Sequence, residues 1–191
     1  MTGSDRKRVK KIMTVQEVIL KKAVRRENMA NDAAGIKDLC FSHRLSVAVA
    51  ESLTAGKIQD ALASVKGASG YFLGGMTVYN LDAKVGLLGV DREHAEKVNC
   101  VSEDVAIQMA QAVALLFGAD IGVATTGYAE PDSERGITPH ANWAIASQSK
   151  VLLYGDDDFP SLWPSRNGVR TEVTATVLKN LRELLVAGVK I

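Results

Sequence analysis

Hydrophobic and polar positions change along the chain in blocks that predict alternating strands and helices. Leu45–Glu51 and Asp120–Thr126 are compact apolar runs, which is typical of buried strands. Residues 33–43 and the segment Ser102–Phe117 instead repeat apolar residues every three or four positions. That spacing places the apolar side chains on one face of a helix, so both segments are predicted to be helical.

The same reasoning predicts three more helices and three more strands. The helices are expected over Lys57–Val65, Asp82–Leu88 and Gly168–Val186, and the strands over Tyr71–Asn80, Asn142–Ser147 and Lys150–Tyr154. Gly74-Gly75 is expected to interrupt the first of these strands, and Tyr128–Ala141 and 155–167 are expected to be loops. Ser102 has the chemistry of a helix N-cap, while Gly89 and Gly118 are expected to end helices in the left-handed conformation.

Strands that alternate with helices are typical of α/β layered domains. Asn142–Ser147 and Lys150–Tyr154 have no helix between them, so one of the two is expected to run antiparallel to the other strands. The sequence therefore predicts an α/β fold with a mixed, mostly parallel sheet. We expect a basic, partly helical N-terminal extension over residues 1–30 and one domain over 31–191.

Composition excludes several classes of protein. The chain has 191 residues, of which 47% are hydrophobic and 24% charged, and this balance excludes wholesale disorder. No apolar run approaches the roughly 20 residues that span a bilayer, and no signal-peptide core follows Met1, so we expect a cytoplasmic protein with no membrane partner.

Cys40 and Cys100 do not make a disulfide framework, and the three histidines (His43, His94 and His140) have no metal-ligand spacing. Neither a metal nor a cofactor is expected.

Charge is concentrated at the N-terminus. Residues 1–26 hold nine basic and two acidic residues, although the whole chain has a net charge of +1. A basic arm can bind nucleic acid, but this one has no aromatic residue to stack on bases, so a solvated arm is favoured over a nucleic-acid partner. Val15, Val18 and Ile19 are expected to form the apolar stripe of a short helix that docks on the body.

Residues that could bind a ligand or take part in catalysis lie where predicted strands end, which is where ligands bind in open α/β sheets. Ser52 follows the strand that ends at Glu51, and the backbone N–H groups beyond it could stabilise an oxyanion. The simpler interpretation is that Ser52 or Thr54 caps the following helix and that Gly56 permits close packing. From this segment alone, the structural interpretation is favoured.

Two further segments offer partners for that serine. Tyr79 ends a strand and Lys84 lies near the start of a helix, where the helix dipole disfavours the ammonium form. A neutral lysine can serve as general base for a serine, although a solvated lysine and a core tyrosine would look the same in the sequence. Thr126 and Gly127 end another strand and can line the same cleft or simply form a turn.

Two arginines, Arg166 and Arg170, stand at the start of the last helix. Either can bind a phosphate or carboxylate through its planar guanidinium group, although surface arginines are common. The chain contains neither a GxGxxG nor a GxxxxGK[ST] motif, so dinucleotide and P-loop functions have no support.

Taken in order, five segments resemble the CinA C-terminal domain family, the nicotinamide-nucleotide amidases. The segments are Ala50-Glu-Ser-Leu-Thr-Ala-Gly56, Phe72-Leu-Gly-Gly-Met-Thr-Val-Tyr-Asn80, Ala83-Lys-Val-Gly-Leu-Leu-Gly-Val90, Val101-Ser-Glu-Asp-Val-Ala106 and Gly118-Ala-Asp-Ile-Gly-Val-Ala-Thr-Thr-Gly127. The resemblance covers about residues 32–187. It implies a three-layer α/β/α fold and hydrolysis of the carboxamide of nicotinamide mononucleotide to nicotinic acid mononucleotide and ammonia.

The resemblance also implies the roles of individual residues. Ser52 would be the nucleophile, Lys84 would take its proton, and Tyr79 would help. The substrate, a small-molecule nucleotide, would be bound by a further set of residues. That set is Thr54, Gly56, Gly75, Asn80, Thr126, Gly127, Arg166 and Arg170. The oligomeric state is left open, including a homo-oligomer.

The chain departs from the family pattern in two places. Leu53 and Ala55 stand where the family has Cys and Gly, and the family's glycine-rich loop is replaced here by a segment that carries Glu130, Asp132 and Glu134. Negative charge near an anionic nucleotide would weaken its binding. A catalytically inactive member that binds a nucleotide or a protein is therefore the alternative to an active amidase.

Overall fold

The fold is organised around one five-stranded sheet with the strand order β2-β1-β3-β4-β5. A computed structural model describes residues 15–159 and 165–188. The strands are β1 (Val47–Glu51), β2 (Phe72–Thr77), β3 (Ile121–Tyr128), β4 (His140–Ala146) and β5 (Val151–Asp158). Strand β1 is parallel to β2 and β3, while β4 is antiparallel to both of its neighbours. The predicted mixed, mostly parallel sheet is confirmed.

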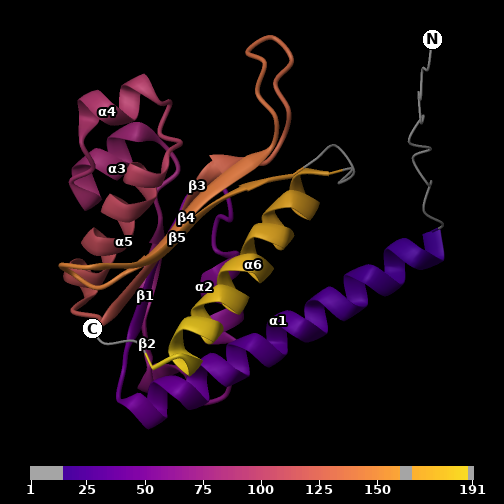
Figure 1. Cartoon of the computed structure of the whole chain (residues 1–191), viewed down its shortest axis with the longest axis vertical. Coiled ribbons are helices and arrows are strands. Elements are labelled where there is room, and N and C mark those ends of the chain that lie inside the picture. Colours follow the sequence, from indigo (N-terminus) through magenta and orange to yellow (C-terminus); the bar gives the residue numbers. More distant parts are fainter. Residues whose placement is uncertain (1–14, 160–164, 189–191) are drawn as a thin grey trace, which may run out of the picture.

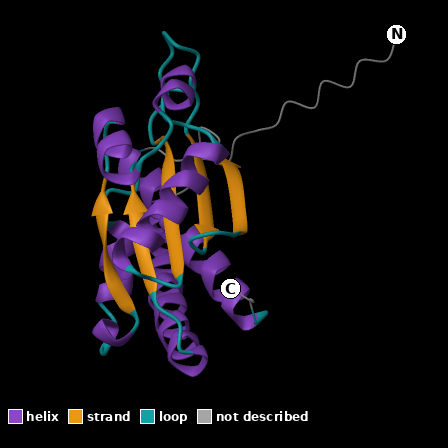
Figure 2. Cartoon of the chain, turned by 90° about the vertical axis from the view of Figure 1, so that its left-hand side faces the viewer, coloured by secondary structure: helices purple, strands orange, loops and turns teal. Residues whose placement is uncertain are grey.

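Helices cover both faces of the sheet (Figures 1 and 2). They are α1 (Val15–His43), α2 (Lys57–Ala63), α3 (Leu81–Leu88), α4 (Arg92–Lys97), α5 (Glu103–Phe117) and α6 (Arg166–Val186), with one turn of 3-10 helix, η1 (Ala68–Gly70). Helices α1, α2 and α6 pack on one side, and α3, α4 and α5 on the other. The three-layer α/β/α architecture is therefore confirmed.

Side chains of the central strand β1 alternate between the two faces of the sheet, so the strand contributes to both halves of the core. In β1, Val47 and Val49 face the layer of α1, α2 and α6, while Ala48 and Ala50 face α5. Small residues on the second face let α5 lie close to the sheet: a Cβ added at Gly122 would stand 1.9 Å from the carbonyl oxygen of Ala110. Because α5 packs close to the sheet, the segment that precedes it lies against the carboxyl ends of the strands.

The N-terminal helix is longer than its apolar pattern indicated. A helix was expected over 33–43, but α1 runs from Val15 to His43 without a break at residue 30. Its C-terminal half packs on α6 through buried residues such as Ile36, while Leu20 is exposed. The side chains of the stripe expected at Val15, Val18 and Ile19, and the basic residues before Val15, lie outside the described residues.

Other differences from the predicted elements have local causes. The strand β2 continues through Gly74-Gly75, where an interruption was expected, but its register with β1 shifts between Phe72 and Gly74, directly before the pair. Gly75 is needed there for space, since a Cβ would lie 2.5 Å from the carbonyl oxygen of Val49. The expected loop Tyr128–Ala141 is bounded by strand at both ends, and its middle projects beyond the sheet (Figure 1). Helix α4, which was not predicted, is capped by Asp91, whose side chain accepts a hydrogen bond from the N–H of His94.

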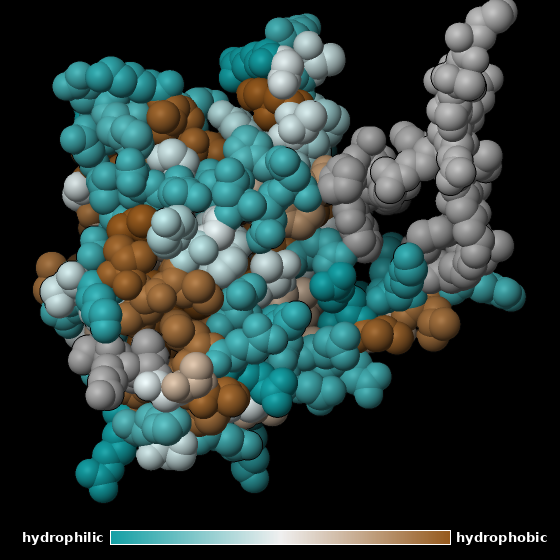
Figure 3. All heavy atoms as spheres, in the orientation of Figure 1, coloured by the Kyte–Doolittle hydropathy of each residue, from teal (hydrophilic) through white to brown (hydrophobic). Residues whose placement is uncertain are grey.

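Apolar side chains are unevenly distributed over the protein surface. Helix α5 carries two exposed leucines, Leu115 and Leu116, at its C-terminal end, and Figure 3 shows an apolar area over the region where Figure 1 draws α5. No helix within the described ranges is both long and apolar enough to cross a membrane.

Candidate active site

Ser52 and Lys84 meet at the carboxyl end of β1. The ammonium or amine nitrogen Nζ of Lys84 lies 3.0 Å from Oγ of Ser52, and it also donates to the carbonyl oxygen of Val78 at 2.9 Å. Both side chains are buried, with 7% of Ser52 and 1% of Lys84 exposed. Ser52 is therefore a buried serine that contacts α3 through Lys84.

Local sequence explains why Lys84 points inward. Asn80 caps α3 by accepting a hydrogen bond from the N–H of Ala83, and Gly89 ends the helix in the left-handed conformation with φ of 63°. Between these caps, Lys84 and Leu88 occupy positions four residues apart and share the buried face. The two ends of the short helix therefore fix the direction of the lysine.

Burial lowers the pKa of Lys84 below its usual 10.5, while the nearby Cys100 opposes the shift. Loss of solvation is the first cause, because water can no longer stabilise the ammonium form. From the sequence, the helix terminus was expected to lower this pKa, whereas in the structure the first cause is desolvation. A lysine with a lowered pKa gives up its own proton more readily, and its neutral amine can then accept the proton of the adjacent hydroxyl.

Glu51 organises the turn that follows Ser52, and sequence reasoning missed it. Its side chain is fully buried and accepts hydrogen bonds from the N–H groups of Gly56, Ile58 and Gln59 at 2.9, 3.2 and 2.9 Å. It thereby satisfies N–H groups at the start of α2, which no residue within the helix can reach. An acidic residue at the end of a buried strand, just ahead of a helix, was the available signal.

Ser52 and Thr54 do not cap α2. The N-cap is Gly56, with φ of 93° and no side-chain hydrogen bond, while Thr54 pairs with the hydroxyl of Thr125 at 2.7 Å. The simpler interpretation of the serine is therefore wrong, because its hydroxyl faces Lys84 instead. Among the described residues, the N–H groups of Leu53 and Thr54 find no acceptor, so two backbone donors follow the hydroxyl along the chain.

Ser52 and Lys84 open onto a cleft of about 740 Å³. Its lining brings together many of the residues singled out in the sequence: Ser52, Tyr79, Asn80, Lys84, Thr126, Gly127 and Arg166. Gly127 has φ of 150°, and a Cβ there would lie 2.3 Å from the carbonyl oxygen of His140. Thr126 donates its hydroxyl to the carbonyl oxygen of Cys100 at 2.6 Å. These contacts tie the strand end to the segment before α5.

Tyr79 stands at the mouth of the cleft rather than beside the serine. Its side chain is 55% exposed, and its hydroxyl accepts a hydrogen bond from Arg166. Arg166 also forms an ion pair of 3.1 Å with Glu130. Tyr79, Arg166 and Glu130 thus form a connected rim, and none of them has a hydrogen bond to Ser52 or Lys84 within the described chain.

Four residues expected to bind substrate lie outside the cleft lining: Thr54, Gly56, Gly75 and Arg170. The guanidinium group of Arg170 is directed to the carbonyl oxygen of Thr54 at 2.8 Å. Its buried Nε has no hydrogen-bond partner among the described residues. Arg170 therefore braces the turn after Ser52 from α6. The structure places Gly75 inside β2 and Gly56 at the start of α2.

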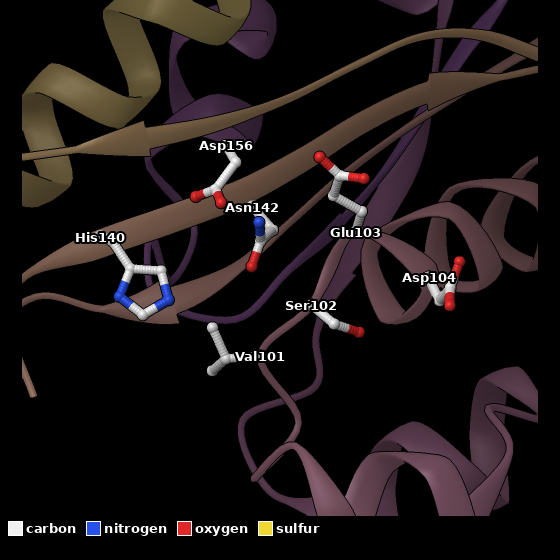
Figure 4. Close-up of a pocket in the computed structure, with 7 residues that line it drawn as sticks. All are labelled: Val101, Ser102, Glu103, Asp104, His140, Asn142 and Asp156. Carbon is white, nitrogen blue, oxygen red and sulfur yellow. The ribbon is translucent and has the colours of Figure 1, made fainter. Parts of the chain in front are cut away.

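A smaller cavity of about 330 Å³ adjoins the cleft, and Val101 lines both (Figure 4). Glu103, Asp104 and Asp156 are among its lining residues, and the carboxylate of Asp104 lies 3.9 Å from Nε2 of His94 in α4. Asn142, which is 3% exposed, also lines this cavity. No group of three metal-ligating side chains occurs in the described part of the chain.

Comparison with known proteins identifies the family. The model of the CinA C-terminal domain matches residues 29–185, and the chain belongs to this family. It is 47% identical over 106 residues to a CinA-like protein of Chlorobium limicola, covering 56% of this chain and 25% of that protein. A CinA-like protein of Dictyoglomus thermophilum is 34% identical over 149 residues, covering 77% of this chain and 35% of that protein. The chain thus spans about a quarter to a third of these relatives.

Solved structures agree with the fold. The competence/damage inducible protein CihA from Agrobacterium tumefaciens superposes with a TM-score of 0.75 at 28% identity, covering 82% of this chain and 95% of that one. Competence damage-inducible protein A from Klebsiella pneumoniae gives 0.78 at 23% identity, covering 84% and 99%. At such low identity the second likeness establishes the fold alone.

Proposed function

We propose that this chain is an amidohydrolase in which Ser52 is the nucleophile and Lys84 the general base. The observation that carries the proposal is the 3.0 Å contact between the two side chains, both buried at a strand end. Nicotinamide mononucleotide is the substrate that the resemblance to nicotinamide-nucleotide amidases implies. The products would be nicotinic acid mononucleotide and ammonia.

The reaction divides into two halves. In the first, neutral Lys84 accepts the proton of Ser52 while Oγ attacks the carboxamide carbon, and the N–H groups of Leu53 and Thr54 supply donors for the oxyanion. The lysine ammonium then returns the proton to the departing nitrogen, which leaves as ammonia. In the second half, Lys84 takes a proton from water, which attacks the acyl-enzyme; the bond from Oγ to the acyl carbon then breaks, the acid leaves, and the lysine ammonium returns the proton to Oγ of Ser52.

Contacts outside the reacting pair support this arrangement. The hydrogen bond from Lys84 to the carbonyl oxygen of Val78 fixes Nζ in place when the hydroxyl moves. Glu51 and Arg170 hold the turn after Ser52 from two sides, through α2 and through the carbonyl oxygen of Thr54. A nucleophile and its donors thereby sit on a rigid turn, which keeps them oriented for attack.

The test measures ammonia released from nicotinamide mononucleotide by the full chain. Ser52→Ala should abolish release, and Lys84→Met should lower kcat by about 10²–10⁴. Ser69→Ala, a substitution of an exposed serine in η1, is the matched control and should keep wild-type activity. Below the pKa of Lys84, kcat/KM should rise with pH as the amine loses its proton. Equal ammonia from the wild type and Ser52→Ala would reject the proposal.

A non-catalytic, ligand-binding member is the second candidate. The observation that favours it is the replacement at residue 55, where the family has Gly: Ala55 has φ of 48°, in the left-handed region that disfavours residues with a Cβ. At this position in the turn next to the nucleophile, alanine fits the left-handed backbone less well than the family's glycine does. Absence of ammonia together with binding of the nucleotide to the wild-type chain would support this candidate.

A further inference from the structure

The rim of the cleft is dominated by carboxylates. Glu130, Asp132 and Glu134 all come from the β3–β4 connection and line the cleft that holds Ser52. Two basic residues line the cleft in the described chain, Arg166 and Lys84. Since Lys84 is 1% exposed and its Nζ already contacts Ser52 and the carbonyl oxygen of Val78, Arg166 is the exposed cation that an anionic substrate could reach in this lining.

Arg166 is already engaged. It forms the 3.1 Å ion pair with Glu130 and donates to the hydroxyl of Tyr79. A phosphate that recruited this guanidinium group would have to displace Glu130 and leave its carboxylate next to the phosphate. Two like charges in contact would weaken binding. The second predicted phosphate ligand, Arg170, does not line the cleft and bonds the carbonyl oxygen of Thr54.

The adjoining cavity strengthens the negative field. Glu103 and Asp156 are among the residues that line it (Figure 4), and Val101 belongs to the lining of both spaces. On the rim, Arg135 lies 3.6 Å from Asp132 and compensates that carboxylate in part. The charged side chains around the cleft together still favour a ligand with positive rather than negative charge at Ser52.

We propose that the cleft prefers a cationic carboxamide that lacks a phosphate, so that a pyridinium nucleoside is a better substrate than its nucleotide. The proposal rests on the amidohydrolase function and specifies its substrate class. Nicotinamide riboside and nicotinamide mononucleotide are the matched probes, since they share the pyridinium ring and the carboxamide and differ only in the phosphate. The hydrolysis is otherwise the same: the C–N bond of the amide breaks, water supplies the oxygen, and ammonia leaves.

The experiment compares the two probes with the full chain, by turnover and by binding. Wild-type kcat/KM should favour the riboside by about tenfold or more at low salt, and the preference should shrink as salt screens the exposed carboxylates. Calorimetry on Ser52→Ala, which does not turn over, should give the same order of affinities. Glu130→Gln frees Arg166 and should move the ratio about tenfold toward the mononucleotide. Glu183→Gln, which removes a carboxylate from the 3.7 Å surface pair with Lys179 in α6, is the control and should leave the ratio unchanged.

The outcomes separate the two proposals. Ammonia from both probes with the mononucleotide preferred would overturn the selectivity and leave the amidohydrolase function in place. No ammonia from either probe, with the riboside bound more tightly by Ser52→Ala, would reject the enzyme and support the selectivity of the cleft. An unchanged probe ratio in Glu130→Gln would overturn the role given to Glu130.

Discussion

The amine of Lys84 lies 3.0 Å from the hydroxyl of Ser52, although 32 positions of the chain separate the two residues. The contact exists because β1 ends beside the first turns of α3, and because Asn80 and the conformation of Gly89 fix where that helix begins and ends. Burial of the pair turns an ordinary serine and lysine into candidate nucleophile and base. Burial also means that the protonated lysine destabilises the folded state at low pH.

That cost predicts a pH-dependent difference in stability between the wild type and Lys84→Met. Because the folded pKa of Lys84 is lowered, the unfolded chain binds its proton more readily between that pKa and 10.5. Wild-type stability should therefore rise with pH across this window, relative to Lys84→Met, and below it the full penalty remains. Urea unfolding at a series of pH values measures the trend. Lys179→Met, which removes an exposed lysine, should show no such trend.

Tyr79→Phe should act mainly on substrate binding. The phenolic hydroxyl is held by Arg166 at the cleft mouth, so its loss should raise KM and leave kcat close to the wild-type value. Steady-state kinetics separate the two parameters, with Tyr154→Phe on β5 as the control for an exposed tyrosine. A fall in kcat as large as that of Lys84→Met would instead give Tyr79 the proton-transfer role that the family resemblance implies.

Glu51→Gln should destabilise the fold. The carboxylate accepts three backbone hydrogen bonds, and the amide would present an NH₂ group to donors that need an acceptor. The free energy of unfolding should fall by about 1–3 kcal/mol, the usual cost of a buried unsatisfied group. Denaturant titration checks this, with Glu27→Gln on the exposed side of α1 as the control. An effect no larger than that of the control would show that Glu51 does not support the turn.

Ala55→Gly should stabilise the protein. Ala55 has φ of 48°, a conformation in which a Cβ costs about 1 kcal/mol and glycine has no such penalty. The reverse is expected at Ala61 in the middle of α2, where a glycine should cost about 1 kcal/mol. Thermal unfolding of the two variants should therefore shift in opposite directions. If Ala55→Gly lowers the melting temperature, the left-handed geometry at this turn carries no penalty.

Much of the fold followed from the sequence because its elements are locally encoded. The periodicity around Met109 and the caps at Ser102 and Gly118 gave α5 its correct limits. Elements without a strong local signal were missed or misjudged. The short α4 has few turns over which to repeat a pattern, and β2 contains a glycine pair that looks like a break until its neighbour Val49 is in view.

The sequence by itself determined the order of strands and helices, the two-sided burial of the central strands, and the set of polar residues at strand ends. Only the tertiary structure decided which of those residues meet. It joined Lys84 to Ser52, drew Tyr79 to Arg166, and turned Arg170 away toward the carbonyl oxygen of Thr54. The physical reason is that periodicity and caps act over a few neighbouring residues, whereas a contact between distant side chains depends on how whole layers pack.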